Sequence, residues 1–320
     1  MKKVLILGGT GFVGTHVCEK LARLQCPVTV ATRRLDHARH LMLLPLLDVV
    51  EVDVNKLVSL APLLDGHDAV VNLVARLHGN EDTFDQTHVQ LLLKLVRDCE
   101  AADVRRIVHI SALGADLNAP SMYQRSKARG EAVLLASGLD VTVLRPSVMF
   151  GAEDKFLNTF ARLQRRFPVI PLACSGARFQ PVWVEDVASA VVRCLQDSST
   201  VDQVYEACGP EVFTLEQLVR LAGQYSGVNK GRGRPVIRLP MALGKLQALL
   251  MELAPGEPLM SRDNLDSMQV DNVASDPLSG LPGLQALGIR PSALRAQAPT
   301  YLGMRGPRST LPGMRRAARR

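Results

Sequence analysis

Tyr123 and Lys127 are the side chains in this sequence best suited to acid–base chemistry. They lie four residues apart within a helical pattern that runs from Ser121 to Ser137, so both side chains share one helix face. An ammonium group beside a phenol favours the phenolate. We therefore expect Lys127 to lower the pKa of Tyr123 from its ordinary value of about 10. The same lysine can hold a nicotinamide ribose, provided that the chain forms a dinucleotide-binding fold.

A glycine-rich segment at the start of the chain supplies that context. An apolar run from Lys3 to Leu7 leads directly into Gly8-Gly9-Thr10-Gly11-Phe12-Val13-Gly14, and an amphipathic stretch follows from His16 to Leu24. Strand, glycine-rich turn and helix in this order bind a pyrophosphate on the helix N-terminus. The glycines fit two registers, one starting at Gly8 and one at Gly9. The alternative is a glycine-rich turn that packs against a neighbour without a ligand.

The end of the next apolar run indicates which dinucleotide is bound. Thr32-Arg33-Arg34 follows it, where an NAD-binding site would place an acidic residue for the ribose 2′-hydroxyl. Two arginines can instead grip a 2′-phosphate by bidentate hydrogen bonds, which favours NADP(H) and leaves NAD(H) possible. The alternative is a solvated basic corner. Asp53 can accept a hydrogen bond from the adenine amino group or cap a helix that starts near Lys56.

Short β-rich runs alternate with helical patterns through the first half of the chain. After the first run, strands are expected at 28–32, 49–52, 69–74, 107–110 and 141–144, and helices at 36–44, 56–64, 82–102 and 121–137. This alternation predicts an α/β fold with a doubly wound parallel sheet covered on both faces. The ligand is expected at the carboxyl ends of the strands.

Beyond Arg145-Pro146 the pattern loosens. We expect a dinucleotide-binding domain over 1–150, a smaller α+β lobe over 151–302 that returns segments to the sheet, and a disordered basic tail over 303–320. Thr214-Leu215-Glu216-Gln217 is a capping box that should start a helix. The apolar stretch 239–253 predicts a core helix; a wall for a hydrophobic ligand or a docking face is the alternative.

Composition and charge exclude several classes of protein. Net charge is +7, and the tail supplies six arginines and no acid. The rest of the chain is therefore close to neutral, and no general nucleic-acid-binding face is indicated. The tail is either a solvated end or a docking segment for an acidic protein or an anionic membrane. The six cysteines form no metal or C-x-x-C pattern, which indicates reduced thiols in a cytosolic protein. Neither a signal peptide nor a membrane span is expected.

Several motifs together resemble the extended short-chain dehydrogenase/reductase superfamily. The glycine segment and Tyr123-x-x-x-Lys127 carry the first part of the resemblance. Stretches 109–116, 123–131, 144–151 and 178–187 are similar to the atypical branch that contains the NADPH-binding alpha-subcomplex subunit nine of mitochondrial complex I and its bacterial relatives. The region 259–264 resembles the bacterial members. The resemblance covers most of residues 1–302.

This resemblance implies a Rossmann domain that holds NADP(H) beneath a small C-terminal lobe. It implies contacts to the pyrophosphate from Gly8, Thr10, Gly11, Phe12 and Val13; to the 2′-phosphate from Arg33 and Arg34; to the adenine from Asp53 and Val54; to the ribose region from Leu73, Val74 and Ala75; and to the nicotinamide end from Tyr123, Lys127, Pro146 and Val148.

The chain departs from active members of the superfamily at one point. These enzymes place a Ser or Thr that orients the substrate carbonyl just past the strand that ends here at Ser111, and Ala112 and Leu113 come next. An oriented hydroxyl contributes on the order of a few kcal/mol to such a transition state. Without it, the tyrosine could border the cofactor yet reduce substrate poorly.

Three functions follow as hypotheses. The first is an NADP(H)-binding protein with weak or no turnover, linked to respiratory complex I or quinone metabolism and located in the cytoplasm or peripheral to the inner membrane. The second is an NADP(H)-dependent reductase or epimerase acting on a nucleotide sugar, an apolar carbonyl or a quinone-pathway substrate, with Tyr123 as general acid/base, Lys127 tuning its pKa and Ser111 orienting the substrate. The third is a redox sensor whose partner binding differs between NADP+ and NADPH. No metal is expected.

Overall fold

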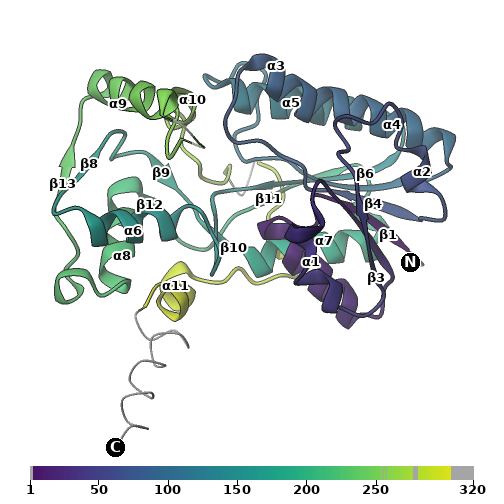
Figure 1. Cartoon of the computed structure of the whole chain (residues 1–320), viewed down its shortest axis with the longest axis horizontal. Coiled ribbons are helices and arrows are strands. Elements are labelled where there is room, and N and C mark those ends of the chain that lie inside the picture. Colours follow the sequence, from purple (N-terminus) through teal and green to yellow (C-terminus); the bar gives the residue numbers. More distant parts are fainter. Residues whose placement is uncertain (1–2, 255, 257, 277–279, 304–320) are drawn as a thin grey trace, which may run out of the picture. The chain divides into compact units, whose positions relative to one another are not determined.

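The chain divides into two compact units. The computed structural model describes residues 3–254, 256, 258–276 and 280–303 (Figure 1). The first unit comprises residues 1–146, 184–208 and 274–290, and the second comprises 147–183, 209–273 and 291–320. From residue 304 onward the predicted basic tail lies outside the described residues. Each unit is considered by itself.

A seven-stranded parallel sheet forms the centre of the first unit. Its order is β11-β6-β5-β4-β1-β2-β3, and every neighbouring pair runs parallel. The strands are β1 (Val4–Leu7), β2 (Val28–Thr32), β3 (Leu47–Glu51), β4 (Ala69–Asn72), β5 (Arg106–Ile110), β6 (Asp140–Pro146) and β11 (Gln203–Ala207). This confirms the predicted α/β doubly wound fold. The chain reverses direction across the sheet between β1 and β4, the place where such folds bind ligands.

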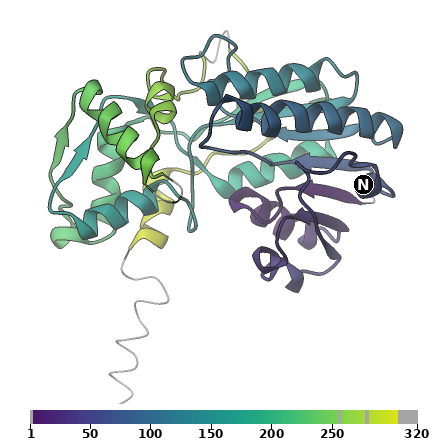
Figure 2. The same ribbon diagram turned by 45° about the horizontal axis from the view of Figure 1, so that its top comes forward.

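Helices cover both faces of this sheet (Figures 1 and 2). One face carries α1 (Phe12–Arg23) and α7 (Val184–Gln196), and the other carries α4 (Leu91–Ala101) and α5 (Met122–Leu135). The inner strands are buried along their whole length, with β1 and β4 reading as unbroken buried runs. Burial on both faces explains why these strands are continuous apolar runs rather than alternating ones.

Two predicted helices are shorter than expected. The range 36–44 forms only 3-10 turns at Leu35–Ala38 and Leu41–Leu43, and the range 56–64 forms only α2 (Ala61–Leu64). In the first range Ala38 and Leu41 are the buried residues. Without a continuous buried face, a segment this short gains too little from packing to offset helix nucleation. The predicted helix 82–102 is present as α3 (Glu81–Asp85), a π-helical turn (Gln86–Gln90) and α4.

The second unit is built from helices and three small strand pairs. Its helices are α6 (Leu157–Arg166), α8 (Leu215–Tyr225), α9 (Met241–Leu253), α10 (Arg262–Ser267) and α11 (Leu294–Leu302). The strand pairs are β7 (Met149–Phe150) with β10 (Val182–Trp183), β8 (Ile170–Leu172) with β13 (Val236–Arg238), and β9 (Arg178–Phe179) with β12 (Phe213–Thr214). The capping box at Thr214 is confirmed. The Thr214 hydroxyl accepts the Gln217 backbone N–H, and the Gln217 side-chain oxygen accepts the Thr214 backbone N–H.

The stretch 239–253 does not form the core helix that its composition favours. It forms α9, but the buried residues of that helix are Gly244 and Ala248, while four of its leucines face outward. The expectation of a core helix was therefore wrong for the leucines, because the close packing of α9 on its neighbours leaves room only for small side chains.

We expect Gly14→Ala to destabilise the first unit. A Cβ at Gly14 would lie 2.5 Å from the Gly8 carbonyl oxygen and from the Gly9 Cα, so backbone must move. Overpacking of this kind costs about 1–3 kcal/mol of unfolding free energy. Urea denaturation measures the loss, and Gly176→Ala is the control because a Cβ there meets nothing within 4 Å. Equal losses in the two variants would contradict the packing argument.

Candidate functional site

The glycine segment forms a tight turn between β1 and α1. Gly8 has φ of +84°, and a Cβ there would lie 3.1 Å from the backbone carbon of Leu73. The Gly11 N–H donates to the Gly8 carbonyl oxygen at 3.1 Å, which closes the turn. No described side chain caps the N-terminus of α1, and its first turn holds no acid. The free N–H groups of that turn therefore remain available to an anion.

The carboxyl end of β2 lies beside this turn. The Thr10 and Thr32 hydroxyl oxygens are 3.5 Å apart, and Arg33 and Arg34 follow as exposed residues. Asp36 pairs with Arg39 instead of entering the corner. Glu51 is the carboxylate that reaches nearby, and it accepts the Leu35 N–H at 3.3 Å. Two arginines beside the pyrophosphate turn suit a second phosphate on the ribose.

Asp53 is engaged locally, as its alternative role suggested. Its carboxylate accepts the Asn55 N–H at 3.1 Å and caps a turn, although no helix begins at Lys56. The Val54 side chain is buried, and its carbonyl oxygen accepts a hydrogen bond from the Lys94 ammonium at 2.7 Å. The carboxylate of Asp53 retains further acceptor capacity, so an adenine contact stays a prediction.

Lys127 is almost completely buried, with an exposed fraction of 1%. Its ammonium donates to the Ile110 carbonyl oxygen at 3.0 Å, at the end of β5. Burial lowers the pKa of Lys127 to about 8, and the nearby Glu131 carboxylate opposes that shift. Arg145 in turn donates to both oxygens of Glu131 at 3.0 Å. The lysine is therefore held at the end of β5, by the residue that precedes Ser111 in the chain.

Tyr123 lies against two aromatic rings on the same face of the sheet. Its ring meets His88 and Phe84 edge-on, at centroid distances of 5.7 and 6.1 Å. Burial raises the pKa of Tyr123 above its ordinary value. The predicted lowering by Lys127 is therefore wrong for this structure, because burial penalises the phenolate and the lysine ammonium is directed to a backbone carbonyl.

His88 belongs to a chain of hydrogen bonds that no sequence motif predicted. The Arg76 N–H donates to His88 Nε2 at 3.1 Å, which fixes Nδ1 as the protonated nitrogen of a neutral imidazole. Nδ1 then donates to the Ser126 hydroxyl at 2.8 Å, and that hydroxyl donates to the Tyr123 carbonyl oxygen at 2.8 Å. Burial lowers the pKa of His88 to about 2, and the charges of Lys127 and Arg76 add to the shift.

His109 and Ser111 carry buried polar atoms without a partner among the described residues. Their exposed fractions are 2% and 3%, and neither His109 Nε2 nor Ser111 Oγ makes a hydrogen bond. The Val74 N–H donates to Asn72 Oδ1 at 3.2 Å, so Asn72 Nδ2 donates to His109 Nδ1 at 3.1 Å. Nε2 of His109 therefore carries an unused proton. A histidine within an otherwise apolar strand was the sequence signal for this group.

The structure brings most of the predicted residues to one edge of the sheet. The segments after β1, β2, β4 and β5 meet there, since the strands are parallel and adjacent. Leu73 and Val74 are half-buried beside Gly8, and Ala75 is exposed. Pro146 ends β6, and its carbonyl oxygen accepts the Leu113 N–H at 2.9 Å. Val148 belongs to the second unit and remains a sequence-based prediction.

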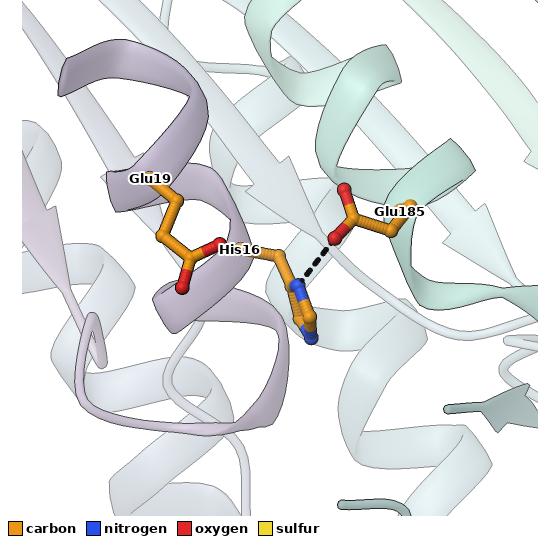
Figure 3. A group of neighbouring side chains, drawn as sticks. All are labelled: His16, Glu19 and Glu185. Atoms are coloured by element: carbon orange, nitrogen blue, oxygen red, sulfur yellow. Dashed lines mark hydrogen bonds and ion pairs between the residues drawn. The ribbon is translucent and has the colours of Figure 1, made fainter. Parts of the chain in front are cut away.

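A separate cluster on α1 and α7 contains potential metal ligands (Figure 3). His16 Nδ1 lies 2.8 Å from Glu185 Oε1, and ligand atoms of His16, Glu19 and Glu185 fall within 4.8 Å of one another. However, the Lys20 ammonium lies 2.7 Å from the other Glu185 oxygen. Burial acts to raise the pKa of Glu185, but the hydrogen bond from Lys20 and the charges of Lys20 and His16 lower it. These ion pairs therefore connect helix α1 to helix α7.

Comparison with known proteins agrees with this geometry. A family model described as NAD(P)H-binding matches residues 8–198, which include the glycine turn, both arginines and the Tyr123–Lys127 pair. The chain belongs to this NAD(P)H-binding family. A nicotinamide dinucleotide is thus the ligand of the site, and the residues at the sheet edge fit its pyrophosphate and ribose.

Relatives of the NAD(P)H-binding chain confirm the predicted resemblance. It is 29% identical over 300 residues to the mouse (Mus musculus) protein "NADH dehydrogenase [ubiquinone] 1 alpha subcomplex subunit 9, mitochondrial", covering 92% of this chain and 78% of the relative. The Arabidopsis thaliana protein of the same name is 29% identical over 288 residues, covering 85% and 70%.

Several solved structures with the same fold are of sugar-nucleotide enzymes. The dTDP-glucose 4,6-dehydratase DesIV of Streptomyces venezuelae, a double mutant with NAD and DAU bound, superposes with a TM-score of 0.65 at 23% identity, covering 74% of this chain and 84% of that one. At this identity the likeness concerns the fold alone.

Among the described residues, no helix is both long and apolar enough to cross a membrane.

We expect His88 to make stability fall at acid pH. The folded protein keeps His88 neutral down to a pKa of about 2, whereas an unfolded histidine binds a proton below a pH of about 6.5. The unfolding free energy therefore decreases as the pH drops below that value, by up to about 1.4 kcal/mol per pH unit from this group. Urea titrations at several pH values between neutral and acid should show a shallower decrease for His88→Gln.

The glutamine can still accept from Arg76 and donate to Ser126, so the variant keeps the hydrogen-bonded chain. His37→Gln, in the exposed part of the turn Leu35–Ala38, is the matched control. Equal pH dependence in wild type and His88→Gln would contradict the assignment.

Proposed function

We propose that this chain holds NADP(H) as a resident ligand, turns over substrate slowly or not at all, and serves the respiratory NADH:ubiquinone oxidoreductase. The main support is the surroundings of Tyr123, whose ring lies against His88 and Phe84 while the Lys127 ammonium donates to the Ile110 carbonyl oxygen. A general acid works best with a pKa near the operating pH, and burial shifts the pKa of this phenol the other way. The names of the related proteins supply the link to the respiratory complex. A location in the cytoplasm or at the inner membrane surface is part of the proposal.

The same proposal gives the residues of the chain defined roles. The turn from Gly8 to Val13 holds the pyrophosphate, Arg33 and Arg34 hold the 2′-phosphate, and Asp53 with Val54 borders the adenine. Lys127 and Tyr123 border the nicotinamide end. The dinucleotide supplies a hydride when bound. A ligand that binds only the folded chain stabilises it by RT ln(1 + [L]/Kd), so a resident cofactor can serve a structural purpose.

One observation favours an active reductase or epimerase as a second candidate. Ser111 Oγ and His109 Nε2 are buried donors that lack partners among the described residues. A buried donor without a partner costs about 1–3 kcal/mol, and a substrate oxygen would satisfy it. The substrate would be a nucleotide sugar, an apolar carbonyl or a quinone-pathway compound, with Tyr123 as proton donor and Ser111 orienting the carbonyl.

Turnover separates these two candidates. Purified protein is assayed for bound NADPH and for NADPH oxidation with carbonyl and quinone acceptors, alongside Tyr123→Phe. We expect both proteins to bind NADPH equally and to oxidise it at the background rate. Hydride transfer in wild type that Tyr123→Phe abolishes, with NADPH binding intact, would establish the enzyme instead.

A cellular assay tests the respiratory role. Cells lacking the chain should accumulate less fully assembled NADH:ubiquinone oxidoreductase on native gels, and both wild type and Tyr123→Phe should restore it. Normal assembly without the chain would refute this part of the proposal and leave NADP(H) binding untouched.

We expect the arginine corner to discriminate NADPH from NADH. Removing a charged hydrogen bond costs about 1.5–3 kcal/mol, so Arg33→Ala and Arg34→Ala should each weaken NADPH binding about tenfold or more and leave NADH binding nearly unchanged. Isothermal titration with both cofactors measures this. Arg39→Ala, whose guanidinium pairs with Asp36, is the control. Equal affinity of the wild type for NADPH and NADH would overturn the preference.

A further inference from the structure

Helix α9 of the second unit presents an apolar face outward. Leu243, Leu246, Leu250 and Leu253 have exposed fractions of 51, 53, 62 and 74%. With 3.6 residues per helical turn, these positions lie on one side of the helix. A surface helix ordinarily buries its apolar side and exposes its polar side. The orientation of α9 is the reverse.

The opposite side of α9 explains this orientation. Gly244 and Ala248 are buried, and a Cβ on Gly244 would lie 2.4 Å from the Cβ of Ala173. Leucines could not occupy this side without moving the helix away.

The charged residues of α9 are also directed to its neighbour α10. The Lys245 ammonium lies 2.9 Å from Asp266, and the Glu252 carboxylate lies 2.9 Å from Arg262. These ion pairs hold the two charges beside α10. Neither charged side chain of α9 therefore covers the leucine face.

Charge is distributed unevenly between the two units. The second unit contains 19 lysines and arginines against nine acids, whereas the first contains 19 against 22. Six of the arginines of the second unit occur within residues 304–320, which follow α11 in the chain and contain no acid. The unit that carries the leucine face is thus strongly cationic.

We propose that α9 docks the second unit onto an anionic phospholipid surface, with the four leucines inserted at the level of the lipid headgroups. Aliphatic side chains together with a net positive charge on the same unit are the combination that binds such surfaces. A second copy of this chain would bring two cationic units together, and their charges would repel. With 13 residues α9 is too short to span a bilayer, so the proposed contact is interfacial. The inference does not depend on the dinucleotide.

Vesicle co-sedimentation of the full chain tests the docking surface. Wild type should bind vesicles of phosphatidylcholine and phosphatidylglycerol mixed at about 7:3, bind pure phosphatidylcholine more weakly, and lose affinity as salt rises. Leu246→Gln/Leu250→Gln should weaken binding to the anionic vesicles by about tenfold or more. Leu253→Gln, at the most exposed of the four positions, should also weaken binding to the anionic vesicles.

The matched control is Leu93→Gln/Leu135→Gln, on α4 and α5 of the first unit, where the leucines are 47 and 42% exposed. It should bind vesicles as wild type does, and NADPH titration and thermal unfolding check that every variant is folded. Three results would overturn the proposal: no vesicle binding by wild type, binding that the α9 variants do not change, or self-association by wild type that the α9 variants abolish without any vesicle binding.

Discussion

The contact between the start of α1 and the end of β1 constrains most of the first unit. A Cβ on Gly14 would approach the Gly8 and Gly9 backbones to 2.5 Å, so helix and strand can meet this closely only through glycine. That approach aims the free N–H groups of α1 at the edge where β1 and β4 separate. The segments after β2, β4 and β5 end at the same edge because the sheet is parallel throughout. Dinucleotide binding is thus a consequence of how one helix packs.

The opposite face of the sheet shows how burial limits chemistry. Tyr123, Lys127, His88 and His109 lie on that face between the sheet and the helices that cover it, and burial disfavours the charged form of each. A raised phenol pKa suits a protein that keeps its cofactor more than one that transfers protons. The buried atoms of His109 and Ser111 that lack partners within the described part of the chain are the counterargument, since unsatisfied buried donors are costly unless a ligand uses them.

The second unit carries a helix, α9, whose apolar side faces outward. Small residues bring α9 close to Ala173, and ion pairs to α10 hold its charges, so its leucines face outward. An apolar face of this kind persists in a protein when something covers it. The excess of cations in the same unit indicates that this cover is an anionic phospholipid surface. The two units then have separate tasks, because the first binds a dinucleotide and the second binds a surface.

The sequence by itself determined the local features. The glycine turn, the individual strands, the capping box at Thr214 and the arginine corner after β2 depend on residues adjacent in the chain, and each was predicted from them. Tertiary structure decided the rest. The pKa of Tyr123 depends on burial by residues such as Phe84 and His88, which are distant in sequence. The direction of the α9 leucines depends on Ala173 and α10. Composition reports how apolar a helix is, but only its packing partners determine which side they leave uncovered.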